Sequence, residues 1–502
     1  MTKKPPKLVL CVIDAMAPAA LEQAVAAGTA PVLAELIARG RYVPDCVAAF
    51  PSVTPVCAAS IVTGVAQDEH LIPGMNWFHR EEDRYIEYGS SFRAAQRFGI
   101  ARQLTDTVYN MNRAHLSPDT LTVFEALDDA EVRTAGTTYL MYRGRHRHEP
   151  QRDTALTRVA STLMRHAVMG PRELFYADIF ASRRTGCRSG LGMPGVRDRH
   201  SGCVSEYMVE HDLFDFLLLS LPDNDWYSHK HGPDAQVRSL AAADLQLARV
   251  VDAAGGIDAF LAEHAVIAMA DHSQAQVAAT IALQDELAEL GVLRPARSPE
   301  GDSRETRARI AVCPSQRAAM VYALRPAERD AMRASVATLA LAIDGVDLVM
   351  WLERDAHDVP REGVIASATH GELRFHPGGA GATVTDPRGC VWSVAGELAS
   401  IDGSIDDTGL LTTPSYPDAL SRAWSALTCP TSGEVLISAA PGYEFLDWGR
   451  QAHVGGGSHG SLHASDSLGA LVLCGVALPE REPAQWAIRD VAALVRAHFV
   501  AS

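Results

Sequence analysis

The sequence predicts an α/β fold with a mostly parallel central sheet and helices on both of its faces. Up to about residue 300, short apolar runs alternate with helical stretches, as in Lys7–Ile13 and in Phe214–Leu221 followed by Asp234–Ala253. This alternation is typical of successive β-α units. It resumes near residue 420 and ends with the apolar run Ala470–Val476 and the amphipathic segment Ile488–Phe499.

An α+β insertion or cap is predicted between residues 301 and 419. The apolar runs there are short, and turn-forming Asp-Gly pairs such as Asp344-Gly345 and Asp402-Gly403 separate them. Such pairs favour tight hairpins between antiparallel strands. The expected organisation is therefore a core of residues 1–300 and 420–502 that carries the 301–419 insertion, which suits a chain of 502 residues.

Charge, apolar runs and cysteine content limit the partners and the location that the sequence predicts. The net charge of −16 argues against binding to a nucleic acid polymer or to an anionic membrane. The sequence contains no apolar run long enough to span a bilayer, and Met1-Thr-Lys-Lys is not followed by a signal-peptide core. Nine cysteines, an odd number without paired spacing, predict reduced thiols and a cytoplasmic location rather than a disulfide framework.

Side chains that bind metal ions stand where several of these apolar runs end. The carboxyl ends of parallel strands meet at one edge of a sheet, so these side chains are expected to gather there. Carboxylates and imidazoles together are ligands typical of zinc. The sequence therefore points to a metal-dependent hydrolase, with the candidate ligands Asp14, Asp225, His229, Asp271, His272 and His459.

A structural role is the alternative for each isolated residue. An Asp that follows a strand is usually a helix cap or a turn residue, and this alternative fits Asp14 taken alone. It also fits Asp223, which shares a loop with Asp225. Asp225 and His229 are four residues apart, so one helical face presents both, and this spacing favours joint metal binding.

Several motifs resemble one family when they are taken in order. The segment from Pro51 to Gly64, with Thr54 near its start, is similar to the nucleophile block of the nucleotide pyrophosphatase/phosphodiesterase family, a branch of the alkaline phosphatase superfamily. The block Asp225-x-x-x-His229-x-x-Gly-Pro, the pair Asp271-His272 and the pair His459-Gly460 resemble the later motifs of that family. The resemblance covers the catalytic core, whereas residues 300–420 show no correspondence.

The resemblance implies an alkaline-phosphatase-like fold and a site for two zinc ions, with manganese as an alternative. Asp225, His229 and His459 would hold one ion, and Asp14, Asp271 and His272 would hold the other, with Thr54 bridging to it. Two such ions can clamp the attacking and leaving oxygens of a phosphoryl transfer. Thr54 would attack phosphorus and form a phosphothreonine that water then hydrolyses.

Thr54 also has alternatives. It stands just before the apolar run Val56–Val62 and would begin a helix, where backbone N–H groups favour an anionic phosphate, but an ordinary N-cap role fits the same position. Ser52 is the rival nucleophile. Cys57 stands three residues after Thr54, where the family usually has an Asn that contacts phosphate, and a thiol is a weak donor.

Substrate contacts are expected from Cys57 and from the arginines of a Gly-rich stretch, above all Arg183 and Arg184. Guanidinium groups can clamp an anion bidentately, although a solvated basic loop is an equal alternative. The other arginines of this stretch are Arg188, Arg197 and Arg199.

Three functions fit these residues. The first is a metal-dependent phosphodiesterase or pyrophosphatase that acts on a small phosphorylated metabolite. The second is a phosphonate C–P hydrolase of the phosphonoacetate hydrolase type, which shares the same superfamily core. The third is a non-catalytic member of the fold. The ligand set does not separate the first two, and the sequence leaves the oligomeric state open.

Overall fold

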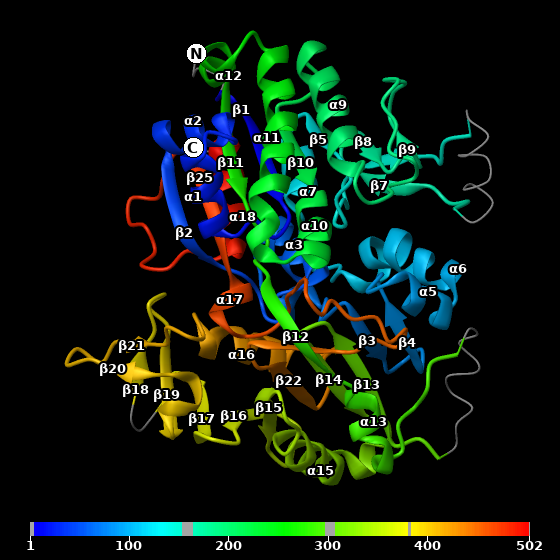
Figure 1. The fold of residues 1–502 in the computed structure, drawn as a ribbon, viewed down its shortest axis with the longest axis vertical. Coiled ribbons are helices and arrows are strands. Elements are labelled where there is room, and N and C mark those ends of the chain that lie inside the picture. Colours follow the sequence, from blue (N-terminus) through cyan, green and yellow to red (C-terminus); the bar gives the residue numbers. More distant parts are fainter. Residues whose placement is uncertain (1–4, 153–163, 297–306, 380–382, 501–502) are drawn as a thin grey trace.

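A computed structural model describes residues 5–152, 164–296, 307–379 and 383–500. The central sheet has eight strands in the order β2-β25-β11-β1-β10-β5-β8-β9 and fills the upper half of Figure 1. Its strands are β1 (Lys7–Ile13), β2 (Arg41–Val47), β5 (Thr134–Gly136), β8 (Glu173–Tyr176), β9 (Phe180–Ala181), β10 (Phe216–Leu221), β11 (His264–Met269) and β25 (Leu468–Cys474).

This sheet is mostly parallel, as predicted. β1 pairs in parallel with β10 on one side and with β11 on the other, whereas β25 runs antiparallel to β11. Alternate residues of β1 point to opposite faces: Leu10 belongs to one buried cluster and Cys11 to the other. Burial on both faces explains why these strands read as continuous apolar runs.

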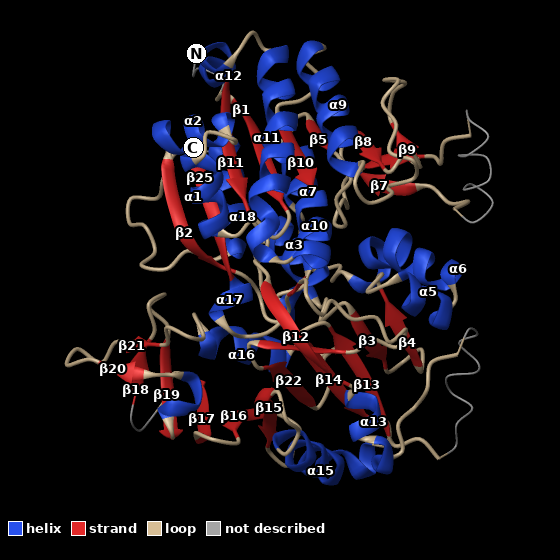
Figure 2. Ribbon diagram, in the orientation of Figure 1, coloured by secondary structure: helices blue, strands red, loops and turns tan. Residues whose placement is uncertain are grey.

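Helices cover both faces of the central sheet (Figure 2). Apolar side chains of one group pack in the cluster that contains Cys11; these helices are α1 (Pro18–Ala26), α2 (Pro31–Arg39), α9 (Arg197–Glu210), α11 (Gln236–Ala253) and α12 (Ile257–Glu263). A second group packs in the cluster that contains Leu10; these are α3 (Thr54–Thr63), α7 (Val123–Asp129) and α18 (Val491–Val500). The predicted layers are therefore present.

A second sheet of eight strands lies below the first in Figure 1, in the order β13-β14-β22-β15-β16-β17-β19-β18. All of its pairings are antiparallel. The strands are β13 (Ile310–Ser315), β14 (Ala318–Ala323), β15 (Val346–Arg354), β16 (Pro360–Ser367), β17 (Gly371–Pro377), β18 (Thr383–Thr385), β19 (Val391–Gly396) and β22 (Val435–Ala439), and they pack with α15 (Arg329–Leu341) and α16 (Ala419–Thr428).

The second sheet is not confined to residues 301–419. Strand β22 comes from beyond residue 419 and lies between β14 and β15, so the predicted boundary does not coincide with the edge of this sheet. A three-stranded ribbon consists of β23 (Gly442–Phe445), β12 (Ala275–Ile281) and β24 (Gly457–Ser458). Its middle strand, β12, follows β11 in the chain and runs from the central sheet toward the second sheet (Figure 1).

Shorter elements complete the fold. Two of them are the helices α5 (Phe92–Phe98) and α10 (Asp223–His231). The others are α4 (Gln67–His70), β3 (Asn76–His79), β4 (Arg84–Glu87), α6 (Ile100–Thr105), the π-helix Asp106–His115, β6 (His146–His148), β7 (Val168–Gly170), α13 (Leu283–Glu286), β20 (Ser404–Ile405), β21 (Leu411–Thr412), α17 (Ala464–Ser467) and short 3-10 turns.

Among the described residues, no single helix has both the length and the apolar character needed to cross a membrane. Helices α1 and α2 meet these criteria only when they are taken together, and the two are bent by 105° relative to each other.

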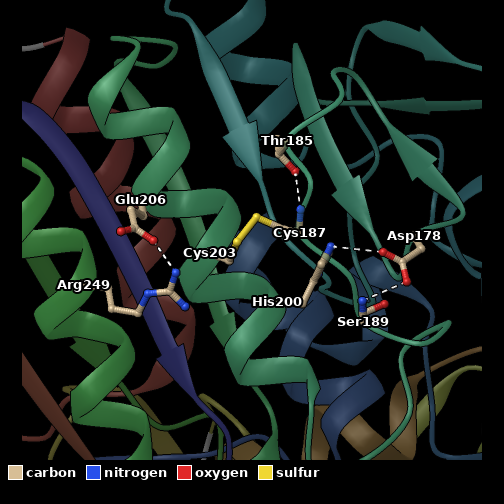
Figure 3. Close-up of a disulfide and its surroundings, with 8 residues drawn as sticks. All are labelled: Asp178, Thr185, Cys187, Ser189, His200, Cys203, Glu206 and Arg249. Atoms are coloured by element: carbon tan, nitrogen blue, oxygen red, sulfur yellow. Dashed lines mark hydrogen bonds and ion pairs between the residues drawn. A yellow bond between two sulfur atoms is a disulfide. The ribbon is translucent and has the colours of Figure 1, made fainter.

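One disulfide corrects the prediction that the cysteines are all reduced thiols. Cys187, in the loop after β9, is bonded to Cys203 on α9, with their Cα atoms 5.9 Å apart (Figure 3). Asp178 holds the same loop, because its Oδ2 accepts from the Ser189 N–H at 2.8 Å and its Oδ1 lies 3.6 Å from His200 Nε2. Within the described ranges the other seven cysteines are free.

Replacing Cys187 and Cys203 together by serine is expected to lower the free energy of unfolding by about 3 kcal/mol. The bond closes a loop with a sequence separation of 16, and its loss returns chain entropy to the unfolded state. Urea denaturation followed by circular dichroism measures the change. Cys390→Ser, at an exposed free thiol, is the control and should have little effect; a double variant as stable as this control would contradict the prediction.

Candidate active site

Three neighbouring strands bring the acidic side chains to one edge of the central sheet. β11, β1 and β10 are adjacent and parallel. Asp14 directly follows β1, Asp225 lies in the first turn of α10 just after β10, and Asp271 and His272 follow β11. The predicted gathering at the carboxyl edge is therefore what the fold produces.

His459 reaches this edge from the loop between β24 and α17. Its carbonyl accepts from the Arg317 N–H at 2.8 Å, which ties the loop to the turn between β13 and β14. The side chains of Arg317 and Asp466 form an ion pair of 2.8 Å and are both fully buried. Asp466 also accepts from the backbone N–H of Ser461, so this pair holds the His459 loop in place.

Ser52, the rival nucleophile, is used to brace the same loop. Its hydroxyl donates to the carbonyl of Ser461 and accepts from the Gly460 N–H, each at 3.0 Å. The side chain is fully buried and does not line the cavity described below. Ser52 therefore has a structural role.

Five of the six candidate ligands form two overlapping groups. In each group the ligand atoms lie within 4.8 Å of one another: Asp14, Asp271 and His272 form the first, and Asp225, His272 and His459 form the second. His272 thus stands between the two groups. His229, expected in the second group, contacts it through Asp225, with Nε2 to Oδ2 at 3.4 Å.

The three imidazoles are oriented alike. Nδ1 of His229, of His272 and of His459 lies at 2.7 Å, 3.1 Å and 2.7 Å from the carbonyls of Gly457, Ser273 and Ser52, respectively. A carbonyl only accepts, so each Nδ1 carries a hydrogen. This leaves each Nε2, which faces the carboxylates, available as a metal ligand.

Burial disfavours the ionised form of these carboxylates unless a cation lies nearby. Burial, together with the charges of Asp271 and Asp225, raises the pKa of Asp14 well above its ordinary value. Burial also acts on Asp225, but the neighbouring His229 and His459 outweigh it and hold the pKa of Asp225 well below its usual range. Asp14 Oδ1 and Asp271 Oδ2 are buried without a hydrogen-bond partner among the described residues. Unpaired buried oxygens of this kind fit a bound divalent cation.

Thr54 lies at the edge of the first group. It is the first residue of α3, and Val53, not Thr54, occupies the N-cap position. The Thr54 hydroxyl lies 3.3 Å from His272 Nε2. The N-cap alternative therefore does not describe Thr54, whose oxygen points to the ligand cluster.

A cavity of about 800 Å³ opens above this cluster. Two cationic side chains, Arg197 and Lys230, belong to its wall. The ligand end of the cavity includes Asp14, Thr54, Asp225, His229, Asp271 and His459, and its aromatic walls include Tyr88, Phe92, Tyr139, Tyr176 and Trp226.

Of the predicted substrate contacts, Cys57, Arg183 and Arg184 are not brought to this cavity within the described structure. Cys57 is fully buried in α3, and burial raises the pKa of its thiol well above the ordinary value. Arg183 pairs with Glu173 at 2.6 Å, and Arg184 is exposed to solvent. The sequence indicated the arginine-rich stretch, but it did not indicate which of its guanidinium groups lies at the cavity.

Arg197 is the arginine of that stretch which lines the cavity. Its Nε donates to Asp223 Oδ1 at 2.9 Å, and Asp223 also accepts from the backbone N–H groups of Gly195 and Asp198. Asp223 therefore has the predicted turn role and, in addition, orients Arg197.

Sequence reasoning missed His453 and Glu444. The His453 ring lies 4.3 Å from that of His229, and its Nδ1 is 3.0 Å from Glu444 Oε2. His453 stands alone in a loop and Glu444 lies in a short strand. Neither residue has a local pattern that could have indicated this contact.

Residues 8–462 match the sequence profile of the family described as Type I phosphodiesterase / nucleotide pyrophosphatase. The chain belongs to this family. The match confirms the resemblance that the motifs indicated. A search of curated protein sequences finds no match.

Two solved structures illustrate the shared fold. Phosphonoacetate hydrolase from Sinorhizobium meliloti 1021, in complex with phosphonoacetate, has a TM-score of 0.54 at 17% identity, and the match covers 99% of this chain and 96% of that one. Murine ectonucleotide pyrophosphatase/phosphodiesterase 5, an inactive variant in complex with AMP, also has a TM-score of 0.54, at 11% identity, with 98% and 95% covered. Both confirm the alkaline-phosphatase-like α/β architecture.

Proposed function

We propose that the protein is a two-zinc hydrolase of the phosphodiesterase/nucleotide pyrophosphatase type, with Thr54 as its nucleophile and a small phosphorylated metabolite as its substrate. The observation that carries the proposal is the 3.3 Å distance between Thr54 Oγ1 and His272 Nε2, inside a buried cluster of carboxylates and imidazoles. Membership of the family supports hydrolysis of phosphate esters.

The donor set suits two divalent cations, zinc or manganese. Asp14, Asp271 and His272 would hold one, and Asp225 and His459, with His229 beside them, would hold the other. When bound, such ions supply positive charge that lowers the pKa of a hydroxyl and neutralises phosphoryl oxygens. The orphaned oxygens of Asp14 and Asp271 support this assignment.

The protein's own residues then account for the reaction. The Thr54 hydroxyl loses its proton to water, and its oxygen forms a bond to phosphorus while the bond from phosphorus to the leaving oxygen breaks. The leaving oxygen takes up a proton from water. The positive end of the α3 dipole, where Thr54 is the first residue, would stabilise the negative phosphoryl group. Water then cleaves the phosphothreonine and restores the hydroxyl. The inactive murine variant, in which alanine replaces a threonine, is consistent with this role.

A phosphonate substrate is the alternative. The basis for it is the pair of cations, Arg197 and Lys230, in the cavity wall, since either could pair with the carboxylate of a molecule such as phosphonoacetate. The structural neighbour crystallised with phosphonoacetate gives this alternative a chemical precedent. A small ligand suits the cavity in either case.

Hydrolysis of nitrophenyl phosphodiesters and of phosphonoacetate by the zinc-loaded enzyme tests the proposal. We expect rapid release of nitrophenol and little phosphate from phosphonoacetate. Phosphate release from phosphonoacetate alone would favour the alternative, with Arg197→Gln then raising its KM. No turnover of either substrate by the metal-loaded protein would contradict both.

A further inference from the structure

A second cavity, of about 720 Å³, is lined by part of the segment that also borders the catalytic cavity. In the loop that follows Asp447, Trp448, Gly449 and Arg450 line the second cavity, whereas residues 451–454 line the catalytic one. A Cβ atom on Gly449 would lie 2.4 Å from the Ala94 nitrogen, so this loop packs directly on α5. The loop and α5 thus form a shared wall between the two cavities.

The second cavity is rich in arginine although the chain carries a net charge of −16. Its described lining contains one acidic residue, Asp285, which already pairs with Arg450 at 2.8 Å. Arg93 and Arg97, one helical turn apart on α5, also line it, together with Arg294. Within residues 5–152, 164–296, 307–379 and 383–500, neither Arg93 nor Arg97 forms an ion pair or a side-chain hydrogen bond. Two neighbouring guanidinium groups that have no carboxylate partner can bind an anion between them.

We infer that this cavity is a second binding site, separate from the catalytic centre, for a small anion of the phosphate class. Oxygens of the anion accept from the guanidinium groups of Arg93 and Arg97. Trp448 supplies an apolar wall. The inference does not depend on the proposed hydrolysis.

Calorimetric titration of the full-length, zinc-loaded protein with inorganic phosphate tests this site. Wild type should show two classes of binding, one at each cavity. The double variant Arg93→Gln/Arg97→Gln should weaken one class at least tenfold and leave zinc content and hydrolysis unchanged. Asp225→Asn should weaken the other class. Arg238→Gln/Arg361→Gln, two exposed arginines elsewhere, matches the change of charge and should bind phosphate as wild type does.

Phosphate binding that is unchanged in the Arg93→Gln/Arg97→Gln variant, or a single class in wild type that Asp225→Asn abolishes, would overturn the inference.

Discussion

Replacing Thr54 by alanine is expected to lower kcat/KM by roughly four orders of magnitude or more, while the protein keeps its fold and its metal ions. The variant loses the oxygen that bonds to phosphorus, and such losses are large because nucleophile and metal act as a unit. Thr54 is not the N-cap of α3, so its loss should cost less than the ~1 kcal/mol typical of a cap. Steady-state kinetics, metal analysis and thermal unfolding measure the three quantities.

Two further variants serve as controls for Thr54. Thr54→Ser keeps a hydroxyl at the start of α3 and should retain part of the activity. Ser52→Ala removes two hydrogen bonds to the His459 loop, so it should weaken metal binding rather than remove the nucleophile. If Thr54→Ala were active and Ser52→Ala inert at full metal occupancy, the nucleophile would be wrongly assigned.

Loss of the metal ligands is the second change with a large expected effect. The purified protein should carry about two zinc or manganese ions per chain, and a chelator should abolish turnover until zinc is restored. Asp14→Ala and Asp271→Ala should both empty the same site, the one that these two residues share with His272. Asp225→Ala should empty the second site. Each variant should lose several orders of magnitude in rate. Plasma mass spectrometry of each variant measures the occupancy.

Because the two ligand groups overlap, some ligand variants should affect both metal ions and others only one. His272 belongs to both groups, so His272→Ala should lower the occupancy of both ions. His229 contacts the second group alone, through Asp225, so His229→Ala should lower the occupancy of one. Asp223→Asn is the control: it should disturb Arg197 and leave metal content unchanged. Full activity in a rigorously metal-free preparation would contradict the two-metal account.

Features encoded in short local patterns could be predicted from the sequence. Strand β1 is a continuous apolar run because helices bury both of its faces, and Asp14 follows it at once. The same holds for β11 with Asp271 and His272. Because neighbouring parallel strands end at one edge, the motif order was sufficient to place these side chains together.

Features that depend on packing between distant segments could not be predicted. Cys187 and Cys203 lie in no motif, and the contact between them exists because a loop folds onto α9. Cys57 was expected at the substrate, but the rotation of α3 that directs Thr54 to the cavity buries Cys57. His453 reaches His229 only through the conformation of a loop. Strand β22 shows the same limit, because its partners in the second sheet come from before residue 419.

Rapid acid quenching of a turnover mixture, followed by peptide mass spectrometry, tests the central claim most directly. A covalent phosphoryl-enzyme at Thr54 is the result that this account predicts, because the Thr54 oxygen lies at the ligand cluster and the Ser52 oxygen is engaged with the His459 loop. The modified peptide should be absent in Thr54→Ala. Phosphate found on Ser52, or turnover without any phosphorylated peptide, would contradict it.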